Sequence, residues 1–345
     1  MTDRLARLRD SLEEPLLVTN VVNVRYLTGL ESTNAALLVE PDRARLFTDF
    51  RYAKRARAVE AAETVEVGRN LAASLAELLS GRIAFEANAV TYATWETLRG
   101  GKLDLVPTRG VVERLRQVKD ESELDAIRRA ADVTSRAFAR FADERFSGRT
   151  ERELAWRMEE LLHEEGGEAL AFPVIVAAGE TGASPHAVPG DRVLEIGQTV
   201  VIDAGAKVDG YCSDCTRTLA VGGLEGRLAE AYLICLEAQL AALEAVRPGT
   251  VGRDADAVPR RIIDGTQFEG MFGHGLGHGV GLEVHEGPTM RPESEDELAV
   301  GNVTSVEPGI YLEGEGGIRI EDLVIVGEGG PEVLTTFPKE LTTVR

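Results

Sequence analysis

The chain has 345 residues, of which 43% are hydrophobic, and its 58 acidic against 38 basic side chains give a net charge of −20. This length favours two domains. The excess of negative charge argues against partners such as nucleic acid or an anionic membrane surface, since both attract clustered cations.

Features of the whole chain also indicate its compartment. No apolar run approaches the roughly 20 residues that span a bilayer. The charged amino-terminal stretch MTDRLARLRDSLEE lacks the apolar centre of a signal peptide. Three cysteines are too few for a disulfide framework. We therefore expect a cytoplasmic protein.

The first hundred or so residues alternate short strand patterns with helical patterns. Helices are predicted at 70–81, with Asn70 as the N-cap and Gly81 at the end, and at 92–101. None of these segments carries a cluster of catalytic residue types. We therefore predict a small α/β domain over residues 1–116. Its strands are predicted at 15–20, 35–40, 44–50 and 82–87.

A charged stretch at 117–123 marks the predicted start of a second domain. Apolar residues then recur at helical spacing from Leu124 to Phe138. Another helix is predicted at 151–163, with Thr150 as its N-cap. Strand patterns at 173–179 and 199–221 are followed by helices near 226–246 and 253–264. These patterns predict an α+β domain over residues 117–345.

The stretch FGHGLGHGVGLEVHEG contains three of the five histidines, His274, His278 and His285. A helical His-x3-His zinc motif is disfavoured because glycine destabilises helices. An extended strand would place His274, Leu276, His278 and Val280 on one face and glycines on the other. A glycine face lets another backbone or a ligand approach closely. The pattern therefore favours a functional strand.

Two aspartates flank a predicted hairpin in the sequence VVIDAGAKVDGYCSDCTRT. If the hairpin turns near Val208-Asp209, Asp203 and Asp214 lie opposite each other, with Cα atoms about 4.5–5.5 Å apart. Facing carboxylates repel each other unless a cation lies between them. The spacing therefore predicts a metal site.

The sequence CSDC permits two other interpretations, a redox pair or half of a zinc site. In a strand, however, residues three apart point to opposite faces, so Cys212 and Cys215 cannot readily bridge or share a metal. The chain has no second such motif. We expect both cysteines to be structural.

Two further acidic residues lie downstream. Glu307 is predicted at a strand end before a Pro-Gly turn, and Glu321 within an apolar strand. A buried carboxylate needs a partner. For Glu321 that partner is either Arg319, on the same predicted face, or a cation. His186 lies in a loop flanked by prolines.

The motifs PHA, DAGA, SDCTRT, GHGVGLEVHE, EPGIY and GIRIED resemble, in this order, those of the pita-bread metallopeptidases. That family includes methionine aminopeptidases, Xaa-Pro aminopeptidases and Xaa-Pro dipeptidases (prolidases). The resemblance covers roughly residues 120–345 and implies a pita-bread fold there. The first domain resembles, more loosely, the creatinase-like α/β domain of the proline-specific members. That domain and the arginine in IRIED favour the proline-specific branch.

The resemblance implies a centre with two divalent metal ions. Asp214 and Glu321 would bridge ions roughly 3.5–4 Å apart. Such an oxygen-rich set suits Mn²⁺, with Co²⁺ or Zn²⁺ as alternatives. The implied ligands are Asp203, Asp214, His278, Glu307 and Glu321.

The resemblance also implies roles for the remaining polar residues. Glu307 would transfer protons, and His285 would stabilise the oxyanion or position the peptide. His186 and His274 would line the pocket for proline and its carbonyl group. Arg319 would orient Glu321 or neighbouring groups.

These residues predict hydrolysis of the amino-terminal Xaa-Pro bond of short peptides, as in aminopeptidase P. The motifs equally permit an Xaa-Pro dipeptidase. The alternative from another class is a catalytically silent pita-bread protein that binds peptides. By resemblance, we also expect a homodimer.

Overall fold

The computed structural model describes residues 2–345. The contacts between residues divide the chain into two compact units, Met1–Arg116 and Gln117–Arg345. Among the described residues, no helix combines the length and the apolar character that a membrane crossing requires.

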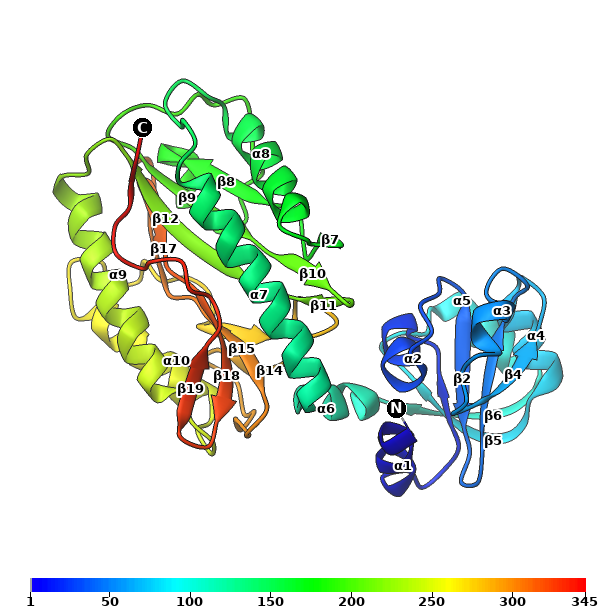
Figure 1. The fold of residues 1–345 in the computed structure, drawn as a ribbon. Helices are drawn as coiled ribbons and strands as arrows, with labels where there is room; N and C mark the ends of the chain where they lie inside the picture. Colours follow the sequence, from blue (N-terminus) through cyan, green and yellow to red (C-terminus); the bar gives the residue numbers. More distant parts are fainter. Residues whose placement is uncertain (1) are drawn as a thin grey trace. The chain divides into compact units, whose positions relative to one another are not determined.

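The first unit is built on one six-stranded sheet in the order β4-β3-β2-β1-β5-β6 (Figure 1). β1 pairs antiparallel with β2 and parallel with β5. Its strands are β1 (Leu16–Val18), β2 (Ala35–Val39), β3 (Ala44–Thr48), β4 (Glu63–Glu66), β5 (Ser80–Glu86) and β6 (Lys102–Thr108). Its helices are α1 (Thr2–Asp10), α2 (Val21–Thr28), α3 (Ala53–Ala56), α4 (Leu71–Leu78), α5 (Tyr92–Arg99) and α6 (Val111–Gln117).

Local signals predicted β1, β2, β3, β5, α4 and α5, with an error at the end of α4, but not β4, β6, α1, α2, α3 or α6. The Asn70 side chain caps α4 by accepting a hydrogen bond from the amide of Ala73. The predicted end at Gly81 is wrong, since α4 ends at Leu78 and Gly81 lies inside β5. Gly81 has φ = +92°, so its left-handed conformation serves a strand rather than a helix end.

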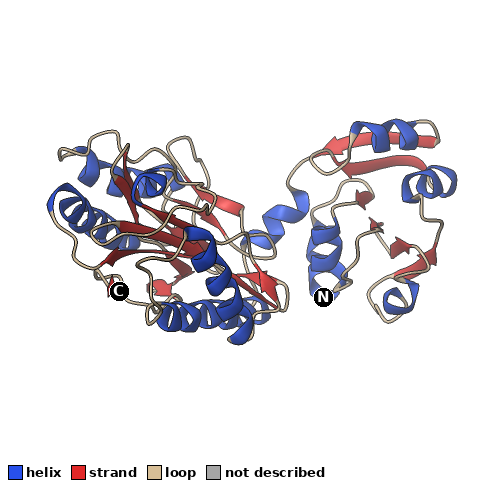
Figure 2. Cartoon of the chain, turned by 90° about the horizontal axis from the view of Figure 1, so that it is seen from above, coloured by secondary structure: helices blue, strands red, loops and turns tan. Residues whose placement is uncertain are grey.

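The second unit places its strands between two pairs of helices (Figures 1 and 2). α7 and α8 share a core with β8, β9 and β12. α9 shares cores with the later strands, and α10 packs beside α9. The helices are α7 (Glu121–Phe141), α8 (Glu151–Glu164), η1 (Gly179–Ala183), α9 (Gly226–Ala245) and α10 (Gly252–Asp264).

The strands of the second unit form four sheets. The orders are β11-β10-β7, β20-β12-β9-β8, β14-β13-β15-β18-β19 and β16-β17. The first eight strands are β7 (Ala169–Leu170), β8 (Ile175–Ala178), β9 (Thr199–Ala204), β10 (Ala206–Val208), β11 (Tyr211–Cys212), β12 (Cys215–Val221), β13 (Gly277–Gly279) and β14 (Glu286–Met290). The remaining strands are β15 (Val303–Val306), β16 (Gly309–Leu312), β17 (Gly316–Arg319), β18 (Asp322–Gly327), β19 (Gly330–Val333) and β20 (Thr343–Val344).

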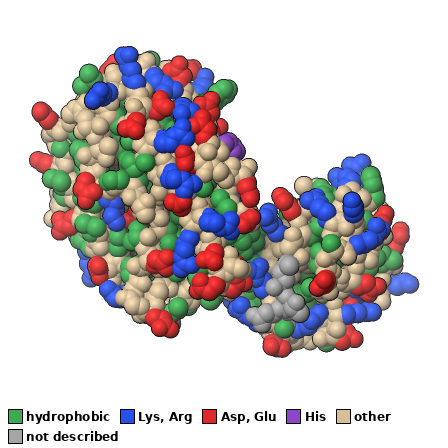
Figure 3. Space-filling view, in the orientation of Figure 1, with side chains coloured by type: hydrophobic (Ala, Val, Ile, Leu, Met, Phe, Trp, Pro, Cys, Tyr) green, Lys and Arg blue, Asp and Glu red, His purple; other side chains and the backbone are tan. Residues whose placement is uncertain are grey.

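Capping boxes define where α7 and α8 begin. Asp120 and Glu123 exchange side chain-to-backbone hydrogen bonds at the start of α7, and Thr150 and Glu153 do the same at the start of α8. Side chains of both signs gather over α7 and α8 in Figure 3. Arg136 of α7, for example, pairs with Glu165 at 2.8 Å. This surface carries several ion pairs near solvent, and each of them contributes little to the stability of the fold.

Candidate active site

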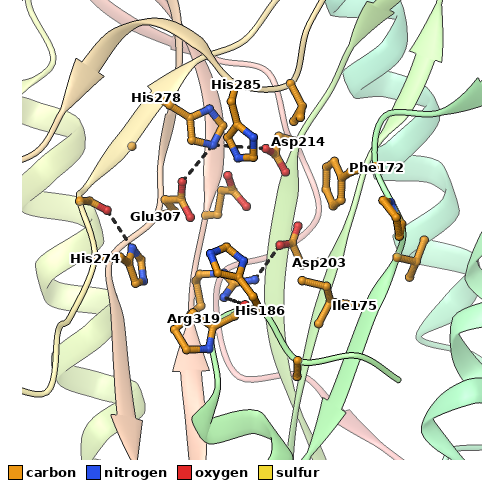
Figure 4. Close-up of a pocket in the computed structure, with 18 of the residues that line it drawn as sticks. Phe172, Ile175, His186, Asp203, Asp214, His274, His278, His285, Glu307 and Arg319 are labelled. Atoms are coloured by element: carbon orange, nitrogen blue, oxygen red, sulfur yellow. Dashed lines mark hydrogen bonds and ion pairs between the residues drawn. The ribbon is translucent and has the colours of Figure 1, made fainter. Parts of the chain in front are cut away.

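One cavity of about 500 Å³ in the second unit collects nearly all the polar residues that the sequence singled out (Figure 4). Its walls come from segments far apart in the chain, since β9 contributes Asp203, the connection between β15 and β16 contributes Glu307, and β17 contributes Arg319. One wall is apolar and includes Phe172, Pro173, Val174, Ile175, Pro185 and Val188. The polar residues in the lining are His186, Asp203, Asp214, His274, His278, His285, Thr289, Arg291, Glu307, Arg319 and Glu321.

The hairpin that carries the two aspartates turns one residue later than predicted. Asp209 and Gly210 both have positive φ, at +50° and +81°, and form the two-residue turn between β10 and β11. Moving a turn by one residue shifts each cross-strand partner by two. Asp203 therefore faces Thr216, not Asp214 as predicted. Asp214 lies just before β12, two residues from Thr216.

Asp203, Asp214 and Glu321 still come together around Thr216. Asp214 lies two residues before Thr216 and therefore shares its face of the extended chain. Thr216 in turn faces Asp203 and binds Glu321. One oxygen from each of the three carboxylates lies within 4.8 Å of the other two. Burial raises the pKa of Asp203, although the charge of Arg319 opposes this rise. Burial, followed by neighbouring carboxylates, raises the pKa values of Asp214 and Glu321 well above their usual range. Asp203 Oδ1 and Glu321 Oε1 are buried without a hydrogen-bond partner among the described residues.

Glu321 and Arg319 depart from the sequence-based expectation. Glu321 lies in the break between β17 and β18 rather than inside a strand. Its Oε2 accepts a hydrogen bond of 2.7 Å from the Thr216 hydroxyl. Arg319 does not pair with Glu321, since its Nη2 lies 2.6 Å from Asp203 Oδ2. The Arg319 Nε also donates to Thr216, at 3.0 Å, so Thr216 links the arginine to Glu321.

His278 and Glu307 form the other half of the polar cluster. His278 Nε2 lies 3.3 Å from Glu307 Oε1 and 3.7 Å from Asp214 Oδ2. Its Nδ1 lies 3.1 Å from the Gly279 carbonyl, which can only accept, so Nδ1 carries the hydrogen. In neutral His278, the Nε2 lone pair therefore faces two carboxylates. In protonated His278, Nε2 instead donates to Glu307. Burial is the largest single influence and raises the pKa of Glu307, but this hydrogen bond and the charges of His278, His274 and Arg319 together lower that pKa to about 2.

The other three predicted histidines lie around this cluster. His285 packs edge-to-face on His278 with ring centroids 4.3 Å apart, and burial lowers the pKa of His285. His274 Nδ1 donates to the Gly275 carbonyl, and its Nε2 lies 2.8 Å from the Tyr311 hydroxyl. Burial lowers the pKa of His274 and raises that of Tyr311 to about 12, so this bond joins two neutral groups. His186 lines the same cavity from the loop after η1.

The glycines around His278 have a structural reason, although the strand is shorter than predicted. A Cβ on Gly277 would lie 2.1 Å from the Ser305 carbonyl oxygen, and one on Gly279 would lie 2.0 Å from the Gly287 carbonyl oxygen. Both glycines therefore let neighbouring backbones approach. Leu276 does not share the histidine face as predicted, because it is fully buried in the core with α9.

The three cysteines are free and buried, as a structural role requires. Cys212 and Cys215 direct their sulfurs to different carbonyls, those of Leu282 and Glu321. Burial raises the pKa of Cys235 to about 12, which disfavours a thiolate there.

Four polar residues in or beside the cavity, Thr216, Thr289, Arg291 and Tyr311, were not predicted from the sequence. Thr216 and Tyr311 each connect two polar side chains of the site. Arg291 follows β14, lines the cavity and is exposed. Thr216 could have been predicted, because it lies two residues after Asp214 and points to the same face of the extended chain. No local sequence pattern marked Tyr311 or Arg291 as a site residue.

The chemistry of this donor set fits divalent cations. Four carboxylates face one guanidinium, which leaves an excess of buried negative charge. Two buried carboxylate oxygens have no hydrogen-bond partner, and an imidazole lone pair points at carboxylates. Cations held between these atoms would satisfy all of these groups at once.

Comparison with known families agrees with the fold and the cavity. Residues 125–328 match the model of metallopeptidase family M24, and residues 4–118 match the creatinase/prolidase N-terminal domain. The chain therefore belongs to metallopeptidase family M24, and it is a hydrolase. The prediction of a pita-bread domain after a creatinase-like domain is confirmed.

Individual relatives match over long stretches. The chain is 41% identical to the Xaa-Pro dipeptidase of Pyrococcus furiosus over 231 residues, which is 67% of this chain and 66% of that protein. The structure of the Xaa-Pro dipeptidase from Bacillus anthracis superposes with a TM-score of 0.95 at 35% identity, covering 99% of both chains. The X-Pro aminopeptidase from Thermotoga maritima reaches a TM-score of 0.89 at 35% identity, covering 98% of this chain and 100% of that one.

Proposed function

We propose that this protein is an Xaa-Pro dipeptidase that uses two divalent metal ions. The observation that carries the proposal is the cavity, in which the acidic cluster lies beside an apolar wall of Phe172, Pro173 and Ile175. An apolar wall suits the proline ring. The prolyl nitrogen carries no hydrogen and cannot donate a hydrogen bond to the enzyme, so contacts with the ring must stabilise the bound substrate. The silent peptide-binding alternative is not retained.

The dipeptidase is preferred over the aminopeptidase expected from the sequence. Relatives named as Xaa-Pro dipeptidases share up to 41% identity, and the B. anthracis dipeptidase superposes over the whole chain. The cavity adds a physical reason. Arg291 is exposed there and makes no hydrogen bond or ion pair with another described side chain. Arginine binds carboxylates in a bidentate manner, so Arg291 is suited to the free carboxylate that follows proline in a dipeptide.

Five residues would hold the metal ions. When bound, the ions supply Lewis acidity that acidifies water and polarises the scissile carbonyl group. The oxygen-rich set favours Mn²⁺ over Zn²⁺, which prefers more nitrogen or sulfur. The residues that would hold the ions are Asp203, Asp214, His278, Glu307 and Glu321.

The remaining residues have distinct tasks. Glu307 has a low pKa and stays ionised at neutral pH, so it can accept a proton from water and pass it to the departing prolyl nitrogen. His285 is held neutral by burial and donates a hydrogen bond to the developing oxyanion. His186 and His274 position proline and its carbonyl group. Arg319 holds Asp203 in place through their ion pair.

The proposal also covers the compartment and the oligomeric state of the enzyme. Three free, buried cysteines suit a reducing compartment such as the cytoplasm. We propose that the protein acts there on short peptides as a homodimer.

The deciding experiment compares an Xaa-Pro dipeptide, its C-terminal amide and an Xaa-Pro-Yaa tripeptide with the Mn²⁺-loaded protein. We expect the dipeptide to have the highest kcat/KM. Arg291→Ala should raise KM for the dipeptide about tenfold and leave the amide, which has no carboxylate, nearly unchanged. A preference for the tripeptide in the unaltered enzyme would instead establish the aminopeptidase.

A second experiment tests the metal requirement. Chelation followed by dialysis should abolish hydrolysis, and Mn²⁺ or Co²⁺ should restore it. Full activity in protein shown to be metal-free by elemental analysis would exclude the two-metal proposal.

A further inference from the structure

The loop that carries His186 forms one wall of the cavity but has little structure of its own. Five consecutive residues, Pro185 to Pro189, line the cavity, and Val188 is 85% exposed. Two of the five are prolines, which have no amide hydrogen to donate. Within this stretch the backbone hydrogen bond from Ala187 to the Ser184 carbonyl is long, at 3.3 Å. The position of the loop therefore depends on how its ends are held.

Glu151, in the first turn of α8, contacts both ends of this loop. Its Oε1 accepts hydrogen bonds from the amide of Ala178, at 2.9 Å, and from the hydroxyl of Thr181. Its Oε2 accepts from the amide of Gly190 at 3.0 Å. Ala178 and Thr181 precede His186, and Gly190 follows it. One carboxylate therefore joins the beginning of the loop to its end.

The burial of Glu151 shows that this arrangement is specific. Glu151 is 1% exposed, and no cation pairs with it among the described residues. A buried carboxylate without a cation must be solvated by hydrogen-bond donors. The three groups that donate to the Glu151 carboxylate are the amides of Ala178 and Gly190 and the hydroxyl of Thr181, and all belong to the loop ends. An apolar residue here would avoid burying a charge but would leave the Gly190 amide without its acceptor.

A second contact holds the middle of the loop from inside the site. Arg319 Nη1 donates to the carbonyl oxygen of Pro185 at 3.1 Å, next to His186. Figure 4 shows His186 among the side chains around the cavity with Arg319 and Asp203. The loop is thus held at its ends by Glu151 and at its middle by an arginine of the site.

We propose that Glu151 is a positioning residue for substrate binding, which acts by joining the two ends of the loop that presents His186 and the apolar wall to the substrate. This proposal rests on the function proposed above, in which His186 contacts proline. Glu151 itself does not line the cavity. Its substitution should therefore affect substrate binding more than turnover.

The test compares Glu151→Ala with Glu153→Ala in the full-length, Mn²⁺-loaded enzyme. Glu153 lies in the same turn of α8 and caps the helix, but its carboxylate contacts only Thr150. Glu153→Ala therefore controls for a weakened helix start. Backbone bonds from the amides of Glu151 and Arg152 to the carbonyls of Arg192 and Gly190 remain in both variants. Steady-state kinetics on an Xaa-Pro dipeptide, bound metal and hydrogen–deuterium exchange of peptides covering 178–190 are measured for each.

For Glu151→Ala we expect faster amide exchange in 178–190, a rise in KM of about tenfold, a kcat within about threefold and unchanged metal content. Glu153→Ala should change none of these four quantities beyond about twofold. Glu151→Gln, which retains one acceptor oxygen, should be intermediate. It also serves as the informative variant if Glu151→Ala does not fold.

Three outcomes would overturn the proposal. Unchanged exchange in 178–190 would mean that Glu151 does not hold the loop. Faster exchange with an unchanged KM would mean that the order of the loop is not used for substrate binding. Equal losses in both variants would reduce Glu151 to a role in helix stability. If the unaltered enzyme does not cleave Xaa-Pro bonds, the proposed function fails, and the exchange data still decide whether Glu151 holds the loop.

Discussion

At the scale of single residues, the site is a concentration of negative charge that the protein alone does not neutralise. Burial raises the pKa values of Asp203, Asp214 and Glu321, whereas the pKa of Glu307 is lowered by His278. The four carboxylates are thus unequal. The pKa of one is lowered by a protonated imidazole, and a positive charge placed among the other three would favour their ionised forms.

Asp214→Asn tests whether that charge is a metal. The substitution preserves shape but removes a negative charge from the centre of the cluster. We expect bound metal to fall below stoichiometric levels and activity to fall at least about a hundredfold. Metal content is measured by elemental analysis after desalting. Normal metal content in the variant would refute the assignment of Asp214 as a ligand.

His285→Ala separates catalysis from metal binding. His285 stacks on His278 but contacts none of the acidic residues through a hydrogen bond or ion pair among the described residues. We expect both metals to remain and kcat to fall by about 10²–10³-fold, as for loss of an oxyanion donor. His163→Ala is the control, because His163 is an exposed residue near the end of α8. Equal losses of metal and rate in His285→Ala would make it a ligand instead.

At the scale of elements, close contact between strands places the imidazole ligand. β13 pairs antiparallel with β15, and a Cβ on Gly277 would lie 2.1 Å from the Ser305 carbonyl oxygen. The Ser305 hydroxyl accepts from the amide of His278 and donates to Glu307 Oε1. The spacing of the two strands therefore sets the distance between His278 and Glu307.

Gly277→Ala should disturb this arrangement from outside the ligand set. The added methyl group forces the strands apart, which we expect to destabilise the protein by about 1–3 kcal/mol and to weaken metal binding. Gly273→Ala is the matched control, since its Cβ would have no neighbour within 4 Å. Melting temperature and bound metal are measured for both variants. Identical behaviour of the two would show that close packing at Gly277 is unimportant.

A buried carboxylate in the first unit, that of Asp49, predicts how the stability of the protein depends on pH. Asp49 follows β3, is fully buried and accepts hydrogen bonds from Arg51 and from Asn34, which precedes β2. The bonds from Arg51 lower the pKa of Asp49. A carboxyl group with a lowered folded-state pKa stabilises the fold above its unfolded pKa, about 3.9, and loses this effect as the pH falls toward the folded value.

We therefore expect Asp49→Asn to lower the melting temperature at pH 7 and to differ less from the unaltered protein as the pH drops below about 4. Thermal unfolding followed by circular dichroism at several pH values measures this. Asp42→Asn, in the exposed turn between β2 and β3, is the control and should have no effect at any pH. An Asp49→Asn deficit that is the same at all pH values would contradict the role of the charge.

At the scale of the whole molecule, the chemistry lies in one unit and the other has no assigned task. The cavity and all the proposed ligands lie within Gln117–Arg345. The first unit contributes a sheet whose buried polar residues, Asp49 and Glu86, are satisfied internally. By resemblance to proline-specific relatives, we expect this unit to support dimerisation or to restrict the substrate.

Deletion of residues 1–112 tests that expectation. The remaining unit should bind metal but lose dimerisation, cleave longer peptides, or both. Light scattering coupled to size exclusion gives the oligomeric state, and a series of Xaa-Pro peptides of increasing length gives the selectivity. A truncated protein that stays dimeric and keeps the full substrate profile would show that the first unit has neither role.

Much of the fold was predictable because it depends on neighbouring residues. The caps at Asn70 and Thr150 accept hydrogen bonds from amides three positions away. The Asp209-Gly210 dipeptide forms a tight turn because both residues take positive φ. The chemical types of the site residues were likewise visible in the sequence, and their order along the chain indicated the metallopeptidase family.

What only the tertiary structure decided is how residues far apart in sequence meet. A turn one residue later than expected made Thr216 the partner of Asp203, and Thr216 then bonds Glu321, which lies 105 positions away. The ion pair of Arg319 with Asp203 joins residues 116 positions apart. Such pairings depend on how strands pack and on which oxygen is left without a partner, so no local pattern specifies them. The sequence by itself therefore determined which groups the site contains, and the packing of the sheets decided which of them touch.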